Sequence, residues 1–387
     1  MKKRILSAIT AIAMATTAMF GMTSSATNSV VVNDPNGSNG ITLSDANYIQ
    51  QYLNAQITPT NLDIVDFDKN GVITYVDAAK VMNCIVNGVA HSVQNSVSET
   101  TNISNNVSYN IFNAQTGNYI LAYTLNKPTV SPNDTGNAVE SRSIIGLDDR
   151  VVDWTKTGTV KIIYGNSEDE CSTGFVVGPH VIATAAHCVY QNSTGKAYEN
   201  IKVKLFNSNG TTAMTCNAVE AHVPMKHIET SGSGDNGTSK WDYALISVNE
   251  DLSAYMQYDL AVARDYAITN NLSVSNTGFP QIVNNTTVNT RNTDCMYSSS
   301  GNLVDVQTDR WGCDSTREIF ISNDTTGGNS GSPVYITESY NGQIYYNVIG
   351  LVYMSNLYIE GVGGNNRAIR MTTSLLRFFK DNPFISY

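Results

Sequence analysis

Three short segments carry residue types that together could perform nucleophilic acyl transfer. They are residues 184–188 (TAAHC), 241–246 (WDYALI) and 325–333 (TTGGNSGSP). A histidine can take the proton of a serine hydroxyl, while a carboxylate holds the imidazole in the required tautomer. We therefore predict that Ser330 is a nucleophile, that His187 is its general base and that Asp242 orients the imidazole.

The order of these residues along the chain, His before Asp before Ser, is that of chymotrypsin-like peptidases. It differs from the orders found in subtilisin and in the α/β-hydrolases. The glycines beside Ser330 let the backbone approach a substrate, and the N–H groups of Gly328 and Ser330 are predicted to form an oxyanion hole. Each residue alone has a structural explanation, such as a buried histidine or an ordinary Gly/Ser turn. The three motifs together favour catalysis.

The composition and the start of the chain indicate an exported protein. The 387 residues carry a net charge of −10, which disfavours nucleic acid as a partner. Basic residues 2–4 precede an apolar run at 5–22, and small residues follow up to Ala26. This pattern predicts a signal peptide over residues 1–26 and a secreted, extracellular protein, with an uncleaved membrane anchor as the alternative.

Residues 31–90 contain an internal repeat of calcium-loop type. In the second copy Gly71 stands at the sixth position, where such loops turn sharply, and Asn39 stands there in the first. The alternative is a pair of Asn/Asp-rich surface turns. The ligands predicted for two calcium ions are Asp34, Asn36, Ser38, Gly40, Thr42 and Asp45 in the first copy, and Asp66, Asp68, Asn70, Val72, Thr74 and Asp77 in the second.

These two loop–helix repeats, each ending in Asp, resemble a type I dockerin. The resemblance implies a small α-helical module that binds two calcium ions and docks onto a cohesin module of a scaffoldin. In that family the residues at loop positions 10 and 11 help to select the cohesin. They are Leu43 and Ser44 in one copy and Tyr75 and Val76 in the other, so the two faces need not be equivalent.

The rest of the chain divides into a polar stretch and a β-rich region. Residues 91–142 are rich in Ser, Asn and Thr, with one apolar patch at 109–125, and are interpreted as a linker or propeptide. From residue 143 to 387 short β-type runs recur between Gly and Asn turns, which predicts an all-β domain. An amphipathic helix is expected at 372–380, packed on a barrel.

The region 143–387 is similar to the bacterial glutamyl endopeptidases. The resemblance rests on residues 143–150 (SIIGLDDR), the segment from Cys171 to Cys188, residues 278–280, the serine turn and residues 366–370. It implies a trypsin-like domain of two six-stranded antiparallel β-barrels, with the triad in the cleft between them. The specificity pocket is assigned to Asp324, Thr325 and Val352. The family places a histidine in this pocket shortly after an Ile-Gly of a late strand, and the corresponding residues 349–353 contain none. A preference for Glu or, through Asp324, for Arg and Lys therefore stays open.

The cysteines and the activation route complete the predictions. Cys171 and Cys188 flank the segment that leads to His187, so they are predicted to form a disulfide; Cys295 and Cys313 are a second candidate pair. Asn329 cannot make the ion pair with a new N-terminus that many chymotrypsin-like zymogens use, yet processing after Arg142 or Glu140 would separate the two modules.

The functional prediction is a secreted serine endopeptidase tethered through its dockerin to a cellulosome-like complex. The alternative is a catalytically silent binding module. A carbohydrate-active enzyme is disfavoured because the sequence shows no recognisable pair of carboxylates for glycoside hydrolysis.

Overall fold

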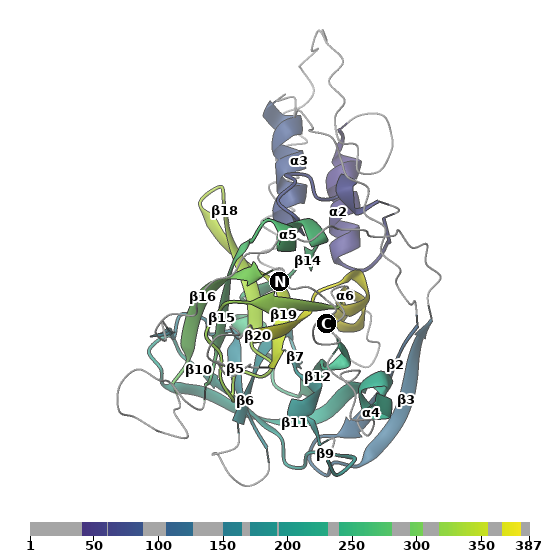
Figure 1. Ribbon diagram of the computed structural model, residues 1–387, viewed down its shortest axis with the longest axis vertical. Coiled ribbons are helices and arrows are strands. Elements are labelled where there is room, and N and C mark those ends of the chain that lie inside the picture. Colours follow the sequence, from purple (N-terminus) through teal and green to yellow (C-terminus); the bar gives the residue numbers. More distant parts are fainter. Residues whose placement is uncertain are drawn as a thin grey trace, which may run out of the picture.

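The computed structural model describes residues 41–59, 61–87, 106–126, 150–164, 171–191, 193–230, 240–280, 295–304, 317–354 and 366–380. A small helical module sits at one end of a larger β-rich body (Figure 1). The predicted signal peptide lies outside the described residues. None of the helices in the described part of the chain is long and apolar enough to cross a membrane.

The first barrel is a closed sheet of six antiparallel strands. The ring closes because β10 pairs with both β5 and β11. In order around the ring, the strands are β5 (Thr159–Ile163), β6 (Cys171–Gly178), β7 (Val181–Thr184), β12 (Ala244–Val248), β11 (Thr212–Pro224) and β10 (Lys202–Phe206).

The second barrel also contains six antiparallel strands, closed by the pairing of β19 with β20. Its strands are β15 (Ser273–Gly278), β16 (Tyr297–Val304), β17 (Glu318–Ile321), β20 (Asn366–Arg370), β19 (Gln343–Met354) and β18 (Pro333–Tyr340). Two short strands extend it: β13 (Tyr258–Leu260) runs parallel to β19, and β4 (Val151–Val152) pairs with β16. The prediction of two six-stranded antiparallel barrels is confirmed.

Local patterns explain several of these elements. In β10 the side chains of Val203 and Leu205 are buried, whereas Lys202 is exposed, which is the alternation of a half-buried strand. The predicted amphipathic helix appears as α6 (Thr373–Lys380), and the ring of its Phe378 packs on Tyr243 with centroids 5.0 Å apart. The C-terminal helix therefore supports the segment that carries Asp242.

The region interpreted as a linker contains a β-hairpin that belongs to the first barrel's sheet. Strands β2 (Asn106–Asn113) and β3 (Tyr119–Asn126) pair with each other, and β2 also pairs with β11. Tyr109 and Ile111 are buried, and the Tyr109 ring packs edge-on against Phe378 at 5.3 Å. The apolar side chains of this stretch become buried because it joins an existing sheet, so its largely polar composition alone does not indicate that it belongs to the barrel.

The helical module consists of α2 (Leu43–Leu53), a 3₁₀ turn η1 (Leu62–Ile64), strand β1 (Val72–Ile73) and α3 (Tyr75–Asn87). A reciprocal capping box begins α2, because the Asp45 carboxylate accepts a hydrogen bond of 2.6 Å from the Thr42 N–H. Among the described residues, strand β1 pairs with no other segment of the module. It pairs with β14 (Val262–Ala263), which follows the first barrel in the chain.

Shorter elements connect the parts of the fold. They are η2 (Ala186–Cys188), β8 (Tyr190–Gln191), β9 (Lys196–Ala197), α4 (Met225–Thr230), η4 (Ser253–Tyr255) and α5 (Asp265–Thr269).

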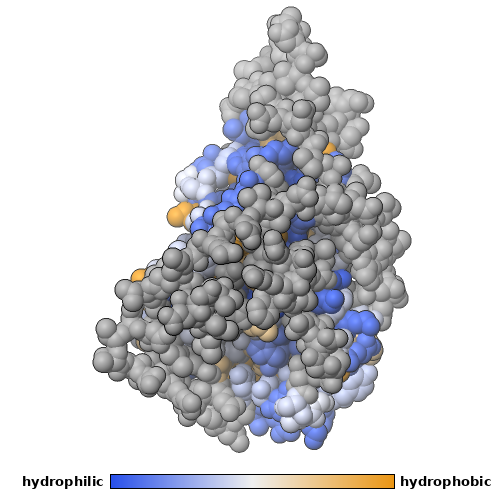
Figure 2. Space-filling model, in the orientation of Figure 1, coloured by the Kyte–Doolittle hydropathy of each residue, from blue (hydrophilic) through white to orange (hydrophobic). Residues whose placement is uncertain are grey.

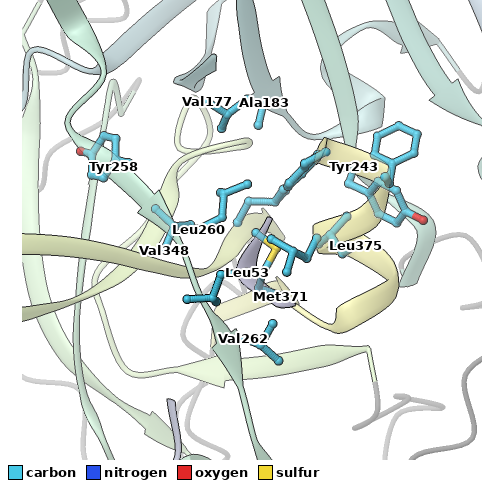
Figure 3. Packing of buried hydrophobic residues seen from close by; sticks show 14 of the residues in the cluster. Leu53, Val177, Ala183, Tyr243, Tyr258, Leu260, Val262, Val348, Met371 and Leu375 are labelled. Atoms are coloured by element: carbon cyan, nitrogen blue, oxygen red, sulfur yellow. The ribbon is translucent and has the colours of Figure 1, made fainter. Parts of the chain in front are cut away.

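One hydrophobic cluster runs through the module and both barrels. It joins Leu53 of the module to Val262, Met371 and Leu375 of the β-rich body, and Figure 3 shows these side chains near one another. By contrast, the outer surface visible in Figure 2 is largely hydrophilic where it is described. The module is therefore fixed to the barrels by burial of apolar surface, which disfavours its separation.

Candidate active site and calcium loop

The fold places His187 beside Asp242 because their strands are neighbours. Thr184 of β7 pairs with Ala244 of β12, so the turn after β7 and the segment before β12 meet at one end of the first barrel. The Asp242 carboxylate accepts two hydrogen bonds, 2.7 Å from His187 Nδ1 and 2.9 Å from the His187 backbone N–H. The backbone bond fixes the carboxylate, so the imidazole is held in one orientation.

Electrostatics reinforce this pair. Burial by itself would lower the pKa of His187, but the negative charge of Asp242 outweighs it, with a further contribution from Cys188, and the pKa rises well above its ordinary value. Burial would likewise raise the pKa of Asp242, yet the His187 charge and hydrogen bond bring it below its usual range. His187 keeps 36% of its side chain exposed against 10% for Asp242, so the imidazole alone is open to a substrate.

The turn that carries Ser330 lies against the turn that carries His187. The Ser330 carbonyl oxygen accepts a 2.9 Å hydrogen bond from the Thr173 N–H of β6. The same oxygen lies 3.7 Å from Cys188 Sγ, next to His187. The three predicted catalytic residues are thus gathered at the junction of the barrels, with Ser330 half-buried.

Two glycines allow this close packing. Gly331 has φ +85°, and a Cβ there would lie 2.0 Å from the Thr173 carbonyl oxygen and 2.3 Å from Thr184 Oγ1. A Cβ on Gly278, in the second barrel, would lie 2.1 Å from Ser332 Oγ. A side chain at Gly331 would push the serine turn away from β6, and one at Gly278 would displace the side chain of Ser332 in that turn.

Thr173 is a structural hub that the sequence did not reveal. Its hydroxyl donates to the Gly328 carbonyl oxygen at 2.7 Å and accepts from the Phe279 N–H at 2.9 Å. The Thr184 hydroxyl in turn donates to the Thr173 carbonyl oxygen at 2.8 Å. A lone threonine in a strand has no local signal, and only the contact between two barrels gives it this role.

The residues before Ser330 form a turn held from both sides. Asn329 accepts the Thr326 N–H at its Oδ1, 3.0 Å away, and its own N–H donates to the Thr326 carbonyl oxygen at 3.0 Å. The Arg150 guanidinium donates to Thr326 Oγ1 at 3.0 Å. The neutral Asn329 is buried and satisfied inside the turn, so its amide takes a structural place there.

The predicted pocket residues lie next to the serine turn, with one correction. Val352 brackets the turn through its backbone, because its N–H donates to Ser332 and its carbonyl oxygen accepts from Gly331. Its side chain, however, is fully buried in the core of the second barrel and presents no surface to a substrate. Thr325 is nearly buried, and Asp324 is partly exposed, with its N–H bound to Ser299 Oγ at 2.8 Å.

The predicted disulfide is a second correction. Cys171 and Cys188 are both buried, and no disulfide bond joins them in the structure. The 3₁₀ turn η2 directs Cys188 Sγ toward the Ser330 carbonyl oxygen, so the sulfur packs under the serine turn. Cys313 of the second candidate pair lies outside the described residues.

The second calcium loop fits a cation. Ligand oxygens of Asp66, Asp68 and Asp77 lie within 4.8 Å of one another. Gly71 turns with φ +88°, and its N–H donates to Asp66 Oδ2 at 3.1 Å, while Asp66 Oδ1 is buried without a hydrogen-bond partner. Burial raises the pKa of Asp77 well above its ordinary value, and the charges of Asp68 and Asp66 raise it further. A divalent cation would relieve both costs.

The other predicted ligands are described in part. The backbone N–H of Asn70 donates to Asp68 Oδ1 at 3.1 Å, and the backbone N–H of Val72 donates to Asn70 Oδ1 at 2.8 Å. Thr74 donates its N–H to Asp77 Oδ2 at 2.8 Å. Of the first copy only Thr42 and Asp45 are described; Asp34, Asn36, Ser38 and Gly40 lie outside the described residues.

Comparisons with known proteins agree with this architecture. Residues 172–340 match the family model of the trypsin-like peptidase domain, and residues 32–86 match that of the dockerin type I domain. A glutamyl endopeptidase of Bacillus licheniformis is 26% identical over 241 residues, which cover 58% of this chain and 67% of that protein.

Two solved structures are also similar. One is a Glu endopeptidase in complex with MPD, with TM-score 0.45 and 20% identity over 63% of this chain and 100% of that one. The other is the thermostable serine protease AL20 from an extremophilic microorganism, with TM-score 0.42 and 14% identity over 60% of this chain and 100% of that one. By the two family models, residues 32–86 of the chain form a dockerin type I domain and residues 172–340 a trypsin-like peptidase domain, and the chain is similar to a glutamyl endopeptidase.

Proposed function

We propose that the chain is a secreted serine endopeptidase that hydrolyses peptide bonds through Ser330, His187 and Asp242. The observation that carries this proposal is the pair of hydrogen bonds between Asp242 and His187, with the Ser330 turn packed beside them. Ser330 Oγ attacks the scissile carbonyl carbon, and His187 accepts the hydroxyl proton. His187 then gives that proton to the leaving amine, and a water molecule completes the second half of the cycle in the same way.

Each partner has a defined task in this cycle. Asp242 keeps the Nδ1 proton of His187 in place, so that Nε2 is free to accept the Ser330 proton. The raised pKa of His187 favours the protonated imidazole that forms when His187 accepts the Ser330 proton. The N–H groups of Gly328 and Ser330 bind the oxyanion, and each such donor is typically worth about 3 kcal/mol.

The substrate side chain is proposed to enter beside Asp324 and Thr325. Asp324 stands six residues before Ser330 and is partly exposed, and the negative charge of its side chain would favour a basic residue at the cleaved bond. The relative from Bacillus licheniformis is a glutamyl endopeptidase, which supports a preference for Glu. The two alternatives predict opposite cleavage patterns, so a peptide digest separates them.

The dockerin domain is proposed to hold two calcium ions and to attach the enzyme to a cohesin-bearing scaffoldin outside the cell. In the second loop Asp66, Asp68 and Asp77 would hold the ion through their carboxylates, with Asn70, Thr74 and the Val72 carbonyl group completing the set. The ion would neutralise the gathered carboxylates and stiffen the loop. The substrates of the attached enzyme would be proteins of the same complex or of its extracellular surroundings.

The test of this function is digestion of a diverse peptide mixture by the full chain, with every cut mapped by mass spectrometry. The Ser330→Ala variant is compared with Ser253→Ala, which alters an exposed serine of η4. We expect cuts with the parent and with Ser253→Ala, and none with Ser330→Ala. Equal cutting by Ser330→Ala would overturn the assignment, and absence of all cutting would favour a silent binding module.

A further inference from the structure

The second repeat of the dockerin domain is built into the peptidase domain. Strand β1 of the calcium loop pairs with β14, with Val72 opposite Ala263. At the end of this ladder the Arg264 N–H donates to the Gly71 carbonyl oxygen at 2.8 Å. A Cβ on Gly71 would lie 2.6 Å from the Ala267 backbone nitrogen, so the two backbones approach too closely for any side chain at this position. We call this contact between residues 71–73 of the loop and residues 262–267 the joint.

Arg264 is the centre of this joint. It is 4% exposed, and its Nη1 donates to Asp66 Oδ2 at 2.7 Å, while its Nη2 pairs with Asp63. The oxygen that it binds is the one that also accepts the Gly71 N–H, so Asp66 Oδ1 is left for a cation. An arginine of the peptidase domain therefore orients a predicted calcium ligand of the dockerin domain.

The charges around the loop also point to a divalent cation. Three carboxylates gather at the loop, two more lie beside them, and three cationic side chains contact the same residues, which gives a formal charge of −2. The carboxylates belong to Asp63, Asp66, Asp68, Asp77 and Glu338, and the cations to Lys69, Lys80 and Arg264. One calcium ion would balance this negative charge. Glu338 lies in β18, so the peptidase domain contributes one of the carboxylates around the loop.

We propose that the second loop binds calcium as part of its contact with the peptidase domain, with Arg264 as the positioning residue; this inference rests on the calcium binding proposed above for the dockerin domain. The docked loop already gathers its carboxylates, so docking lowers the cost of ordering the site. Thermodynamic linkage then requires that calcium strengthens docking by the same factor. The repulsion between Arg264 and the ion is offset because Asp63 neutralises the guanidinium on its other side.

The test combines calorimetry with hydrogen exchange on the full chain, with Ca²⁺ as the only added ligand. The reporter is a peptide that contains the Arg264 amide, because that amide is protected only while the loop is docked. We expect calcium to slow its exchange at least about tenfold, with a midpoint that matches one site of the binding isotherm. In Asp77→Asn both the site and the slowing are lost, and in Asp34→Asn, which alters the first loop, both remain.

Arginine variants isolate the positioning residue. Arg264→Gln is expected to weaken one calcium site by about 10- to 100-fold, as is typical for residues that support metal ligands. Arg264→Lys keeps the charge and has an intermediate effect, which gives a second reading where the Gln variant does not fold. The matched control is Arg317→Gln, whose guanidinium lies over the Trp241 ring at 4.0 Å, and both calcium sites are retained there.

Three results would overturn the proposal. The first is calcium binding at the second loop with no change in exchange of the Arg264 amide. The second is unchanged or tighter binding in both Arg264 variants. The third is no binding at the second loop at all. None of these results depends on peptide hydrolysis, so they leave the peptidase assignment to its own test.

Discussion

Replacing Asp242 by Asn removes the charge that controls His187 while keeping the shape of the side chain. The wild-type carboxylate accepts two bonds, of 2.7 and 2.9 Å. In the variant, the amide oxygen can keep the backbone bond, but the amide NH₂ then faces Nδ1 and forces it to accept. The proton moves to Nε2, where it blocks transfer from Ser330. We expect kcat/KM to fall by about 10⁴-fold, or about 5.5 kcal/mol.

The pH dependence of the same variant has a definite sign. Only the neutral imidazole can accept a proton, so wild-type activity rises as pH increases through the raised pKa of His187. Without the Asp242 charge, burial of the imidazole dominates and lowers that pKa. The acidic limb of kcat/KM, measured on a peptide substrate from about pH 5 to 10, should therefore move to lower pH. An unchanged or higher midpoint would refute the electrostatic reasoning.

Three other substitutions test the scaffold. Gly331→Ala places a methyl group against the Thr173 carbonyl oxygen. We expect the free energy of unfolding, measured in urea, to fall by more than about 2 kcal/mol, together with loss of peptidase activity. An unchanged free energy of unfolding would show that the turn can shift freely. Thr173→Val removes the hydroxyl and leaves the Gly328 carbonyl oxygen and the Phe279 N–H without that partner. We expect the free energy of unfolding to fall by about 2–4 kcal/mol and kcat to fall by a larger factor than KM changes. An unchanged kcat would contradict the role of Thr173. Tyr52→Phe removes the buried 2.7 Å bond to Thr373, which should cost about 1 kcal/mol without changing kcat/KM; no loss of stability would speak against the shared core.

The catalytic segments and the all-β class could be predicted because their signals are local, whereas the two six-stranded barrels were implied by the family resemblance. The motifs around His187, Asp242 and Ser330 are short, and the run 201–205, most of which forms β10, alternates between apolar and charged residues. The β2–β3 hairpin showed only the apolar patch at 109–125, and its place in the fold depends on distant partners, because Tyr109 is buried where β2 pairs with β11 and packs against α6. A polar segment that joins an existing sheet resembles a linker when its partner strands are unknown.

Contacts between distant residues account for the other differences. Arg264 and Asp66 are 198 positions apart, so the charge pair that joins the two domains leaves no local pattern. Val352 occupies a position that the family resemblance assigns to the pocket, yet the barrel core takes its side chain. The proximity of Cys171 and Cys188 along the chain favoured a disulfide, whereas η2 turns the second sulfur toward Ser330.

Covalent labelling with a fluorophosphonate probe tests the central claim most directly. The Ser330 Oγ should attack the phosphorus atom and release fluoride, and peptide mapping by mass spectrometry should locate the adduct on Ser330. We expect labelling to fall sharply in His187→Ala and at pH values below the pKa of His187, because the general base is then absent or protonated. An adduct on another residue, or equal labelling in His187→Ala, would contradict the account.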